Sequence, residues 1–210
     1  MRVLSAAVLV VGLSVLLPTC AYSQPETGPS DDAGFAFSRA PDEVVLQLSY
    51  DGGLIENPDP MPFVRVFGDG RVIVHYPVYM KKAGDYVLRL SDQELESLLA
   101  TFAKEDIVTV NEPRMEEMLA EARIETGPVE PPEDHGATVA VEMRFESVPA
   151  TAPAAPPLTD VERRIAVPVS AVETGIRAPS TTLQGIAAGI RQLEDLARRP
   201  DLEKISDGGR

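Results

Sequence analysis

Alternation of apolar and polar residues predicts three strands in the first half of the chain. The run Val44-Val45-Leu46-Gln47-Leu48-Ser49-Tyr50 turns every second side chain to one face, which is typical of a half-buried strand. Two more strands are predicted at residues 63–67 and 71–76. The Gly68-Asp69-Gly70 segment between them indicates a hairpin, because glycine and aspartate tolerate the positive φ angles of tight turns.

The second half of the chain carries two further strand patterns on either side of a proline-rich segment. Residues 138–146 alternate valine, methionine and phenylalanine with polar residues, which predicts a strand with one buried face. Residues 149–158 are a Pro/Ala-rich insertion with few side chains that could pack into a core. A partner strand is predicted over residues 161–167, where Arg163 interrupts the apolar face.

Three segments show the apolar spacing of amphipathic helices. The first begins at Ser91, which is predicted to form a capping box with Glu94, and its leucines recur every three or four residues. A shorter helix is predicted after Pro113, with its methionines as core residues. The last helix is predicted to begin at Thr181, in a second capping box with Gln184.

The order of these elements predicts the fold class. Strands and helices are segregated along the chain, and the predicted hairpin requires antiparallel neighbours. We therefore expect an α+β fold, a two-layer sandwich with a mostly antiparallel sheet and helices packed on one face. Gly185 and Gly189 in the last helix are predicted to let it lie close to the sheet.

The N-terminal region predicts an export signal and a leader. Residues 1–23 read as a signal peptide, because Arg2 precedes the apolar run Val3–Leu17, which is shorter than the roughly 20 residues of a membrane-spanning helix. Residues 24–42 are rich in Pro, Gly, Ser and Asp and are predicted to be a flexible leader. A single α+β domain is predicted over residues 43–198, followed by a flexible tail at 199–210.

Cys20 offers a way to anchor the exported protein to a membrane through a lipid. It is the only cysteine of the chain and lies where a bacterial lipoprotein carries its lipidated residue, although Thr19 fits the lipobox poorly. Cleavage after Ala21 or Ser23 would instead release a form without cysteine and without disulfides. We expect a periplasmic or extracellular protein, either free or anchored through a lipid on Cys20, with no membrane-spanning segment after the signal is removed.

The composition and charge of the chain limit the classes of partner that it can bind. The 210 residues are 44% apolar and carry a formal net charge of −14. Nucleic-acid binding needs clustered Lys and Arg, whereas the 19 basic residues here are scattered, so no nucleic-acid partner is predicted. We expect an unidentified protein or cell-envelope partner instead.

Two histidines are the first candidates for chemistry. His75 falls on the predicted strand 71–76, and its simpler interpretation is a polar residue on the sheet face. His135 lies beside Glu133 and Asp134 in a loop, and such a trio suits a divalent cation. Adjacent residues rarely point at one centre, so no metal site is predicted from them.

The acidic-glycine segments are the second candidates. Asp51-Gly52-Gly53 is not followed by the Gly-Lys-Ser/Thr of a phosphate-binding loop, and calcium coordination by Asp51, Asn57 and Asp59 lacks the spacing of an EF-hand. We interpret Gly52, Gly53, Gly68 and Gly70 as turn residues. The chain also lacks a Gly-x-Ser-x-Gly elbow, so no catalytic, cofactor-binding or metal-binding residue is predicted.

The segment from Asp51 to Phe102 resembles a group of uncharacterised exported bacterial proteins and lipoproteins. They share a strand ending in Asp/Glu-Gly-Gly, a proline-marked loop, a "YGDGRVI"-like hairpin and a helix opening with Leu-Ser. Here these elements are Asp51–Gly53, Phe67–Ile73 and Leu90–Phe102. The resemblance implies a bacterial, exported, non-enzymatic protein.

The order of elements is also similar to that of emfourin, a small proteinaceous inhibitor of protealysin-type metalloproteases. A strand, a Gly-Gly pair, a Leu-rich helix, a later strand pair and a closing helix after Pro179 recur, but the export signal and the Pro-rich insertion depart from it. Three hypotheses follow: a non-catalytic binding module, an inhibitor of a secreted metalloprotease, and a metal-dependent enzyme using His75 or His135.

Overall fold

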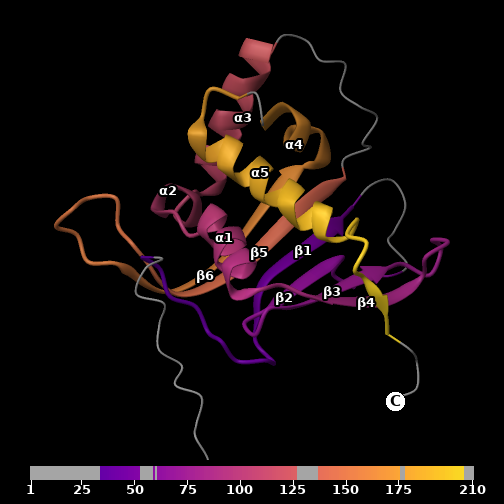
Figure 1. Cartoon of the computed structure of the whole chain (residues 1–210). Coiled ribbons are helices and arrows are strands. Elements are labelled where there is room, and N and C mark those ends of the chain that lie inside the picture. The colour runs from indigo at the N-terminus through magenta and orange to yellow at the C-terminus, as the bar shows by residue number, and fades with distance from the viewer. Residues whose placement is uncertain (1–33, 53–58, 60, 127–136, 176–177, 206–210) are drawn as a thin grey trace, which may run out of the picture.

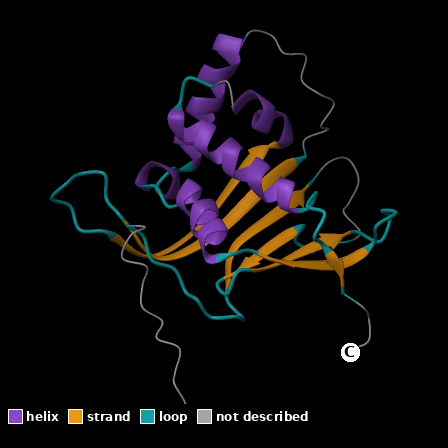
Figure 2. Ribbon diagram, viewed as in Figure 1, coloured by secondary structure: helices purple, strands orange, loops and turns teal. Residues whose placement is uncertain are grey.

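One antiparallel sheet and a layer of helices make up the structure (Figures 1 and 2). The computed structural model describes residues 34–52, 59, 61–126, 137–175 and 178–205. In this part of the chain all strand pairs are antiparallel, and the helices lie together on one face of the sheet. The predicted α+β fold is confirmed.

The elements follow one another in an order that the sequence pattern predicts in outline. They are β1 (Val44–Asp51), β2 (Val64–Phe67), β3 (Arg71–Tyr76), β4 (Gly84–Arg89), α1 (Asp92–Phe102), α2 (Glu105–Val108), α3 (Glu112–Thr126), β5 (Thr138–Val148), β6 (Leu158–Pro168), α4 (Val169–Gly175), α5 (Thr181–Leu196) and β7 (Glu203–Lys204).

The sheet has the strand order β6-β5-β1-β2-β3-β4-β7. Strands that follow one another in the chain pair as hairpins, with two exceptions. β1 pairs with β5 and brings the two halves of the chain together, and β4 pairs with the short C-terminal β7. The two long hairpins project at opposite ends of the sheet, β5–β6 at the left and β3–β4 at the right of Figure 1. Because β7 has only two residues, β6 is the one long edge strand of the described sheet.

The helices α1 and α5 of the helix layer are amphipathic and have side-chain caps at their N-termini. The predicted capping box of α1 is confirmed: the Ser91 Oγ accepts the Glu94 N–H, and the Glu94 carboxylate accepts the Ser91 N–H at 2.8 Å. For α5 the predicted box at Thr181 is wrong, because Ser180 is the N-cap and accepts the Leu183 N–H. The apolar stripe of α5 is buried at Leu183, Ile186, Ile190 and Leu193.

The two glycines of α5 allow it to approach other helices and not the sheet, which corrects the prediction. A Cβ added at Gly189 would lie 2.3 Å from the Phe102 ring at the end of α1. At Gly185 the nearest atom is the Ile107 Cδ1 of α2, at 3.0 Å. The ring of Phe102 thus occupies the space that a side chain on α5 would need.

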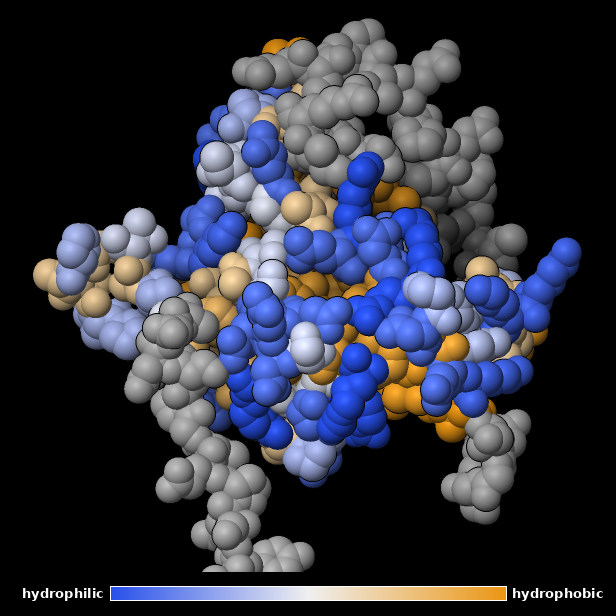
Figure 3. All heavy atoms as spheres, viewed as in Figure 1, coloured by the Kyte–Doolittle hydropathy of each residue, from blue (hydrophilic) through white to orange (hydrophobic). Residues whose placement is uncertain are grey.

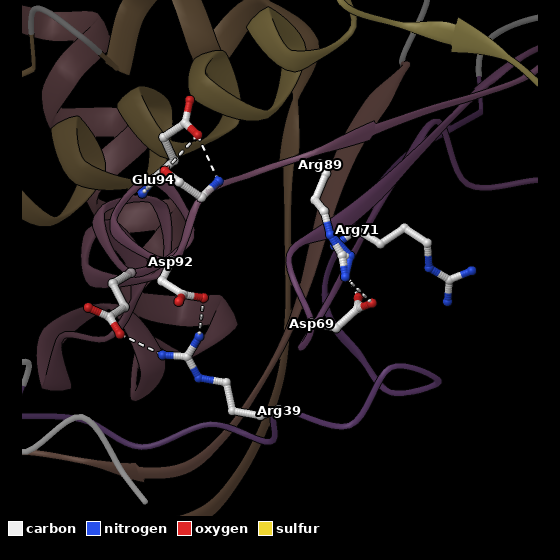
Figure 4. Close-up of polar contacts among 8 residues, drawn as sticks. Arg39, Asp69, Arg71, Arg89, Asp92 and Glu94 are labelled. Atoms are coloured by element: carbon white, nitrogen blue, oxygen red, sulfur yellow. Dashed lines mark hydrogen bonds and ion pairs between the residues drawn. The ribbon is translucent and has the colours of Figure 1, made fainter. Parts of the chain in front are cut away.

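The packed chain begins before the predicted boundary at Glu43. Phe35 and Phe37 are buried, and Ala36 exchanges backbone hydrogen bonds with Ser147 at the end of β5. Arg39 then reaches α1, with 3.2 Å to the Asp92 carboxylate and 2.5 Å to that of Glu96 (Figure 4). The composition of this segment is typical of a loop, but its two phenylalanines tie it to the core.

The contact between Gly189 and Phe102 predicts the effect of adding one methyl group. Gly189→Ala should lower the free energy of unfolding by about 1–3 kcal/mol, because the ring of Phe102 is buried and has little room to move. Gly185→Ala is the matched control: its neighbour is the flexible end of Ile107, and alanine favours the helix by about 1 kcal/mol. Urea unfolding followed by circular dichroism measures both, and equal effects would contradict this account.

Candidate functional site

His75 lies between two aspartates at one end of the sheet. It is on β3, directly across from Asp85 on β4, and Asp59 comes from the segment that precedes β2. The Nδ1 atom is 2.6 Å from the Asp85 carboxylate and the Nε2 atom is 2.9 Å from the Asp59 carboxylate. The side chains of His75 and Asp59 are each only 12% exposed.

Both contacts can be hydrogen bonds only if both ring nitrogens carry a proton, because a neutral imidazole has a single N–H. Burial acts to lower the pKa of His75, but the hydrogen bonds to Asp85 and Asp59 outweigh it, and the net pKa is raised above its ordinary 6.5. The hydrogen bond from His75 lowers the pKa of Asp59 below 3.8. Below this raised pKa, His75 is an imidazolium between two carboxylates.

This arrangement does not favour metal binding, because both ring nitrogens of His75 are already engaged by carboxylates. Within the described residues no group of three His, Cys, Asp or Glu side chains is placed to hold a metal ion. His135 with Glu133 and Asp134 lies outside the described residues, as do Cys20, Gly53 and Asn57.

An aromatic pocket of about 380 Å³ adjoins His75. Tyr50, Phe63 and Tyr76 stack edge to face along it, with ring centroids 5.6 and 5.9 Å apart. The two tyrosines are tied to the end of α5: the Tyr50 hydroxyl donates to Glu194 and the Tyr76 hydroxyl donates to the Ala197 carbonyl, both at 2.5 Å. Burial and then the bond to Glu194 raise the pKa of Tyr50, so both hydroxyls serve as structural donors.

Next to this pocket, the β3–β4 hairpin tip exposes apolar side chains. Val78 is 74% exposed, Tyr79 66% and Met80 44%, and Met61 beside the pocket is 44% exposed. Figure 3 shows apolar atoms at the surface on this side of the molecule, next to hydrophilic ones.

A hollow larger than this aromatic pocket lies elsewhere, between α3 and the edge strand β6. It has a volume of about 780 Å³. Met115 and Leu119 of α3, with Val110 and Ile165, give it apolar walls, and Glu112, Glu116 and Arg163 add charges of both signs. Ala166 and Pro168 bring the outer edge of β6 into the lining. The hollow, which we call the α3–β6 groove, thus runs along a strand edge.

Arg163 is the half-buried charged residue among those that line this groove. An Nη of its guanidinium donates to the carbonyl of Val110, which lies between α2 and α3. Its Nε is buried and has no hydrogen-bond acceptor among the described residues. In the sequence, this site is visible only as an arginine that interrupts the apolar pattern of the strand. The sequence did not predict a groove, because the pattern does not show that α3 lies beside β6.

The acidic-glycine residues do not meet around one site. Asp51 ion-pairs with Arg164 on β6 at 2.5 Å. Asp69 lies in the β2–β3 turn, where it accepts the Arg71 N–H and faces Arg89 of β4, each at 3.1 Å (Figure 4). The Asp59–His75–Asp85 cluster was missed, because alternation places His75 on a face without identifying its cross-strand partner.

The turn glycines have different reasons to be glycine. Gly52 and Gly70 have positive φ angles of 79° and 83°. Gly68 is required by close approach, since a Cβ there would lie 1.9 Å from the Ser38 carbonyl oxygen. The segment before β1 therefore passes directly over the β2–β3 turn.

Comparisons of the chain with protein-family models, curated proteins and solved structures find no match. Among the helices of the described residues, none has the length and apolar character needed to cross a bilayer.

The charge state of the His75 cluster predicts a pH-dependent stability. Because the pKa of His75 is raised on folding, its contribution is complete below about pH 6.5 and is lost as the pH rises through the higher folded pKa. Because the pKa of Asp59 is lowered, its contribution is complete above about pH 3.8 and is lost as the pH falls through the lower folded pKa.

His75→Asn should therefore destabilise the protein most near pH 5 and much less near pH 9. Urea unfolding of both proteins at the two pH values measures the difference. Arg114→Gln, on the exposed face of α3, is the control and should give the same small difference at both. A loss at His75→Asn that is constant with pH would contradict the imidazolium.

Proposed function

We propose that the protein is a non-catalytic binding module exported from a bacterial cell, and that the α3–β6 groove is its binding surface. One observation carries the proposal: this roomy hollow combines apolar walls with a few polar groups, as ligand-binding clefts do. Its volume of about 780 Å³ is within the range of small-molecule and peptide sites.

The chemistry of the lining supports binding over catalysis. The titratable side chains of the groove are Glu112, Glu116, Arg163 and Arg164, and the two glutamates are exposed on α3. Among the described residues that line the groove there is no serine, cysteine or histidine, so none of them offers a nucleophile or an imidazole base to a ligand. His75, the described histidine, is committed to Asp59 and Asp85 at another part of the sheet.

Blocking the groove should abolish ligand selection. Phage-displayed random peptides should enrich on the wild-type protein but not on Ala120→Glu, because Ala120 is exposed and lines the groove, where glutamate adds bulk and charge without touching the core. Ala188→Glu, exposed on α5 and outside the groove lining, is the matched control and should enrich like wild type. Absence of enrichment, or enrichment that Ala120→Glu leaves intact, would contradict the proposal.

A second candidate function is inhibition of a secreted metalloprotease. The observation that favours it is the apolar tip of the β3–β4 hairpin, where Val78, Tyr79 and Met80 are exposed. Figure 1 shows this hairpin projecting at the right-hand end of the sheet. A projecting apolar loop is a shape that enters a protease cleft. The similarity to emfourin in element order agrees with this candidate.

Titration against a thermolysin-like protease tests the inhibitor hypothesis. It expects stoichiometric loss of activity, weakened at least tenfold by Tyr79→Ala, because Tyr79 supplies a large exposed apolar contact. Lys81→Ala in the same hairpin is the control. Full protease activity at an excess of the protein would remove this candidate.

A further inference from the structure

The outer edge of β6 pairs with no other strand of the described residues along the groove. Val169 N donates to Ala137 O, and the register runs without interruption from Thr138 opposite Pro168 to Phe145 opposite Val161. Antiparallel pairs alternate between hydrogen-bonded and non-hydrogen-bonded types. The alternation makes Val161, Arg163, Ile165 and Val167 face β5 with their backbone groups.

The backbone N–H and C=O groups of Glu162, Arg164 and Ala166 consequently point away from the sheet. None of them has a backbone partner elsewhere in the described chain. Strand edges of this kind pair readily with another extended chain. This unpaired edge borders the α3–β6 groove, because Arg164 and Ala166 are both among the residues that line the groove.

We infer that the α3–β6 groove takes an extended segment of another protein, which adds to β6 as a further antiparallel strand. The inference rests on the proposed function and names the class of ligand. The stretch of β6 in the groove, from Arg163 to Pro168, is about 20 Å long, enough for about six residues of a partner strand. The outward groups hold the partner's backbone, and α3 covers one face of it.

The side chains of β6 define what the partner carries. Ile165 and Val161 both turn toward the helix layer, so apolar partner residues belong across from them. Ile165 lies in the groove with Met115 and Leu119 of α3, and Val161 lies two residues beyond the end of the groove lining. Between them lies Arg163, whose Nε has no acceptor in the described chain. Directly opposed side chains have Cβ atoms about 5 Å apart, so an aspartate across from Arg163 reaches the guanidinium.

The complementary segment therefore reads apolar–x–Asp–x–apolar. The two x positions face the open side of the sheet, where Arg164 is already paired with Asp51 and Glu162 with Arg144. The groove's own acids, Glu112 and Glu116, are exposed to solvent on α3, which screens their repulsion of that aspartate.

A second copy of the chain fits this pattern poorly. If β6 paired with itself in the register that sets Val161 across from Ile165, the two Arg163 side chains would face each other in the groove. A like-charge pair directly opposed across strands is destabilising. A partner with aspartate at that position removes the repulsion and provides the acceptor.

The probe is a fluorescein-labelled peptide of sequence Thr-Val-Thr-Asp-Thr-Val-Thr, and its binding to the full chain is followed by fluorescence anisotropy. The same peptide with lysine in place of aspartate should bind about tenfold more weakly. Two further probes carry N-methyl groups on every second residue, one on the odd and one on the even positions. Only one of the two should lose binding, because only alternate N–H groups of an added strand face β6.

Ala166→Pro tests the protein side. It removes an outward N–H at an edge position where proline is tolerated, and it should abolish probe binding, whereas Ala166→Thr keeps the N–H and the affinity. The N-methylated probes keep the test valid if Ala166→Pro lowers stability, since they leave the protein unchanged.

Each other outcome overturns the inference in a distinct way. Binding that is indifferent to the phase of methylation and to Ala166→Pro would leave a groove that binds peptides without strand addition, and the proposed function would stand. If phage selection yields peptides but the labelled probe does not bind, the apolar–x–Asp–x–apolar pattern is overturned and the proposed function stands. A doubled mass in analytical ultracentrifugation that Ala166→Pro removes would assign β6 to a second copy.

Discussion

The pairing of β6 with β5 is the interaction on which the architecture and the proposed function both depend. Its register decides which side chains of β6 enter the helix layer and which face the open side of the sheet. Ile165 and Val167 become core residues, Arg164 joins the ion pairs of the open face, and Arg163 is left inside the groove. A shift by one residue would exchange these roles, because successive side chains of a strand point to opposite faces.

The same pairing leaves a long strand edge that the described chain does not cover. Natural sheets protect such edges with short strands, charges or prolines. At the opposite edge β7 has only two residues, while β6 has eleven and is protected by Glu162, Arg164 and the terminal Pro168. A protected edge beside a helix-walled groove is suited to a specific partner, because the charges and the Arg163 position restrict which strand can add.

Local signals made parts of the fold predictable from the sequence. Alternation identified β1, β3 and β5, and Ser91 with Glu94 identified the start of α1, because these patterns involve residues close in the chain. Phe35 and Phe37 were missed because a Pro/Gly/Ser-rich composition surrounds two buried rings. The Asp59–His75 contact and the α3–β6 groove depend on strand order and register between distant segments, which alternation does not encode.

Amide hydrogen exchange along β6, followed residue by residue by NMR on the free protein, tests the central claim most directly. The account predicts slow exchange at Arg163, Ile165 and Val167, whose N–H groups bond to β5, and fast exchange at Glu162, Arg164 and Ala166, whose N–H groups point into solvent and the groove. Uniform protection along the strand would show that the edge is already covered and would contradict the account.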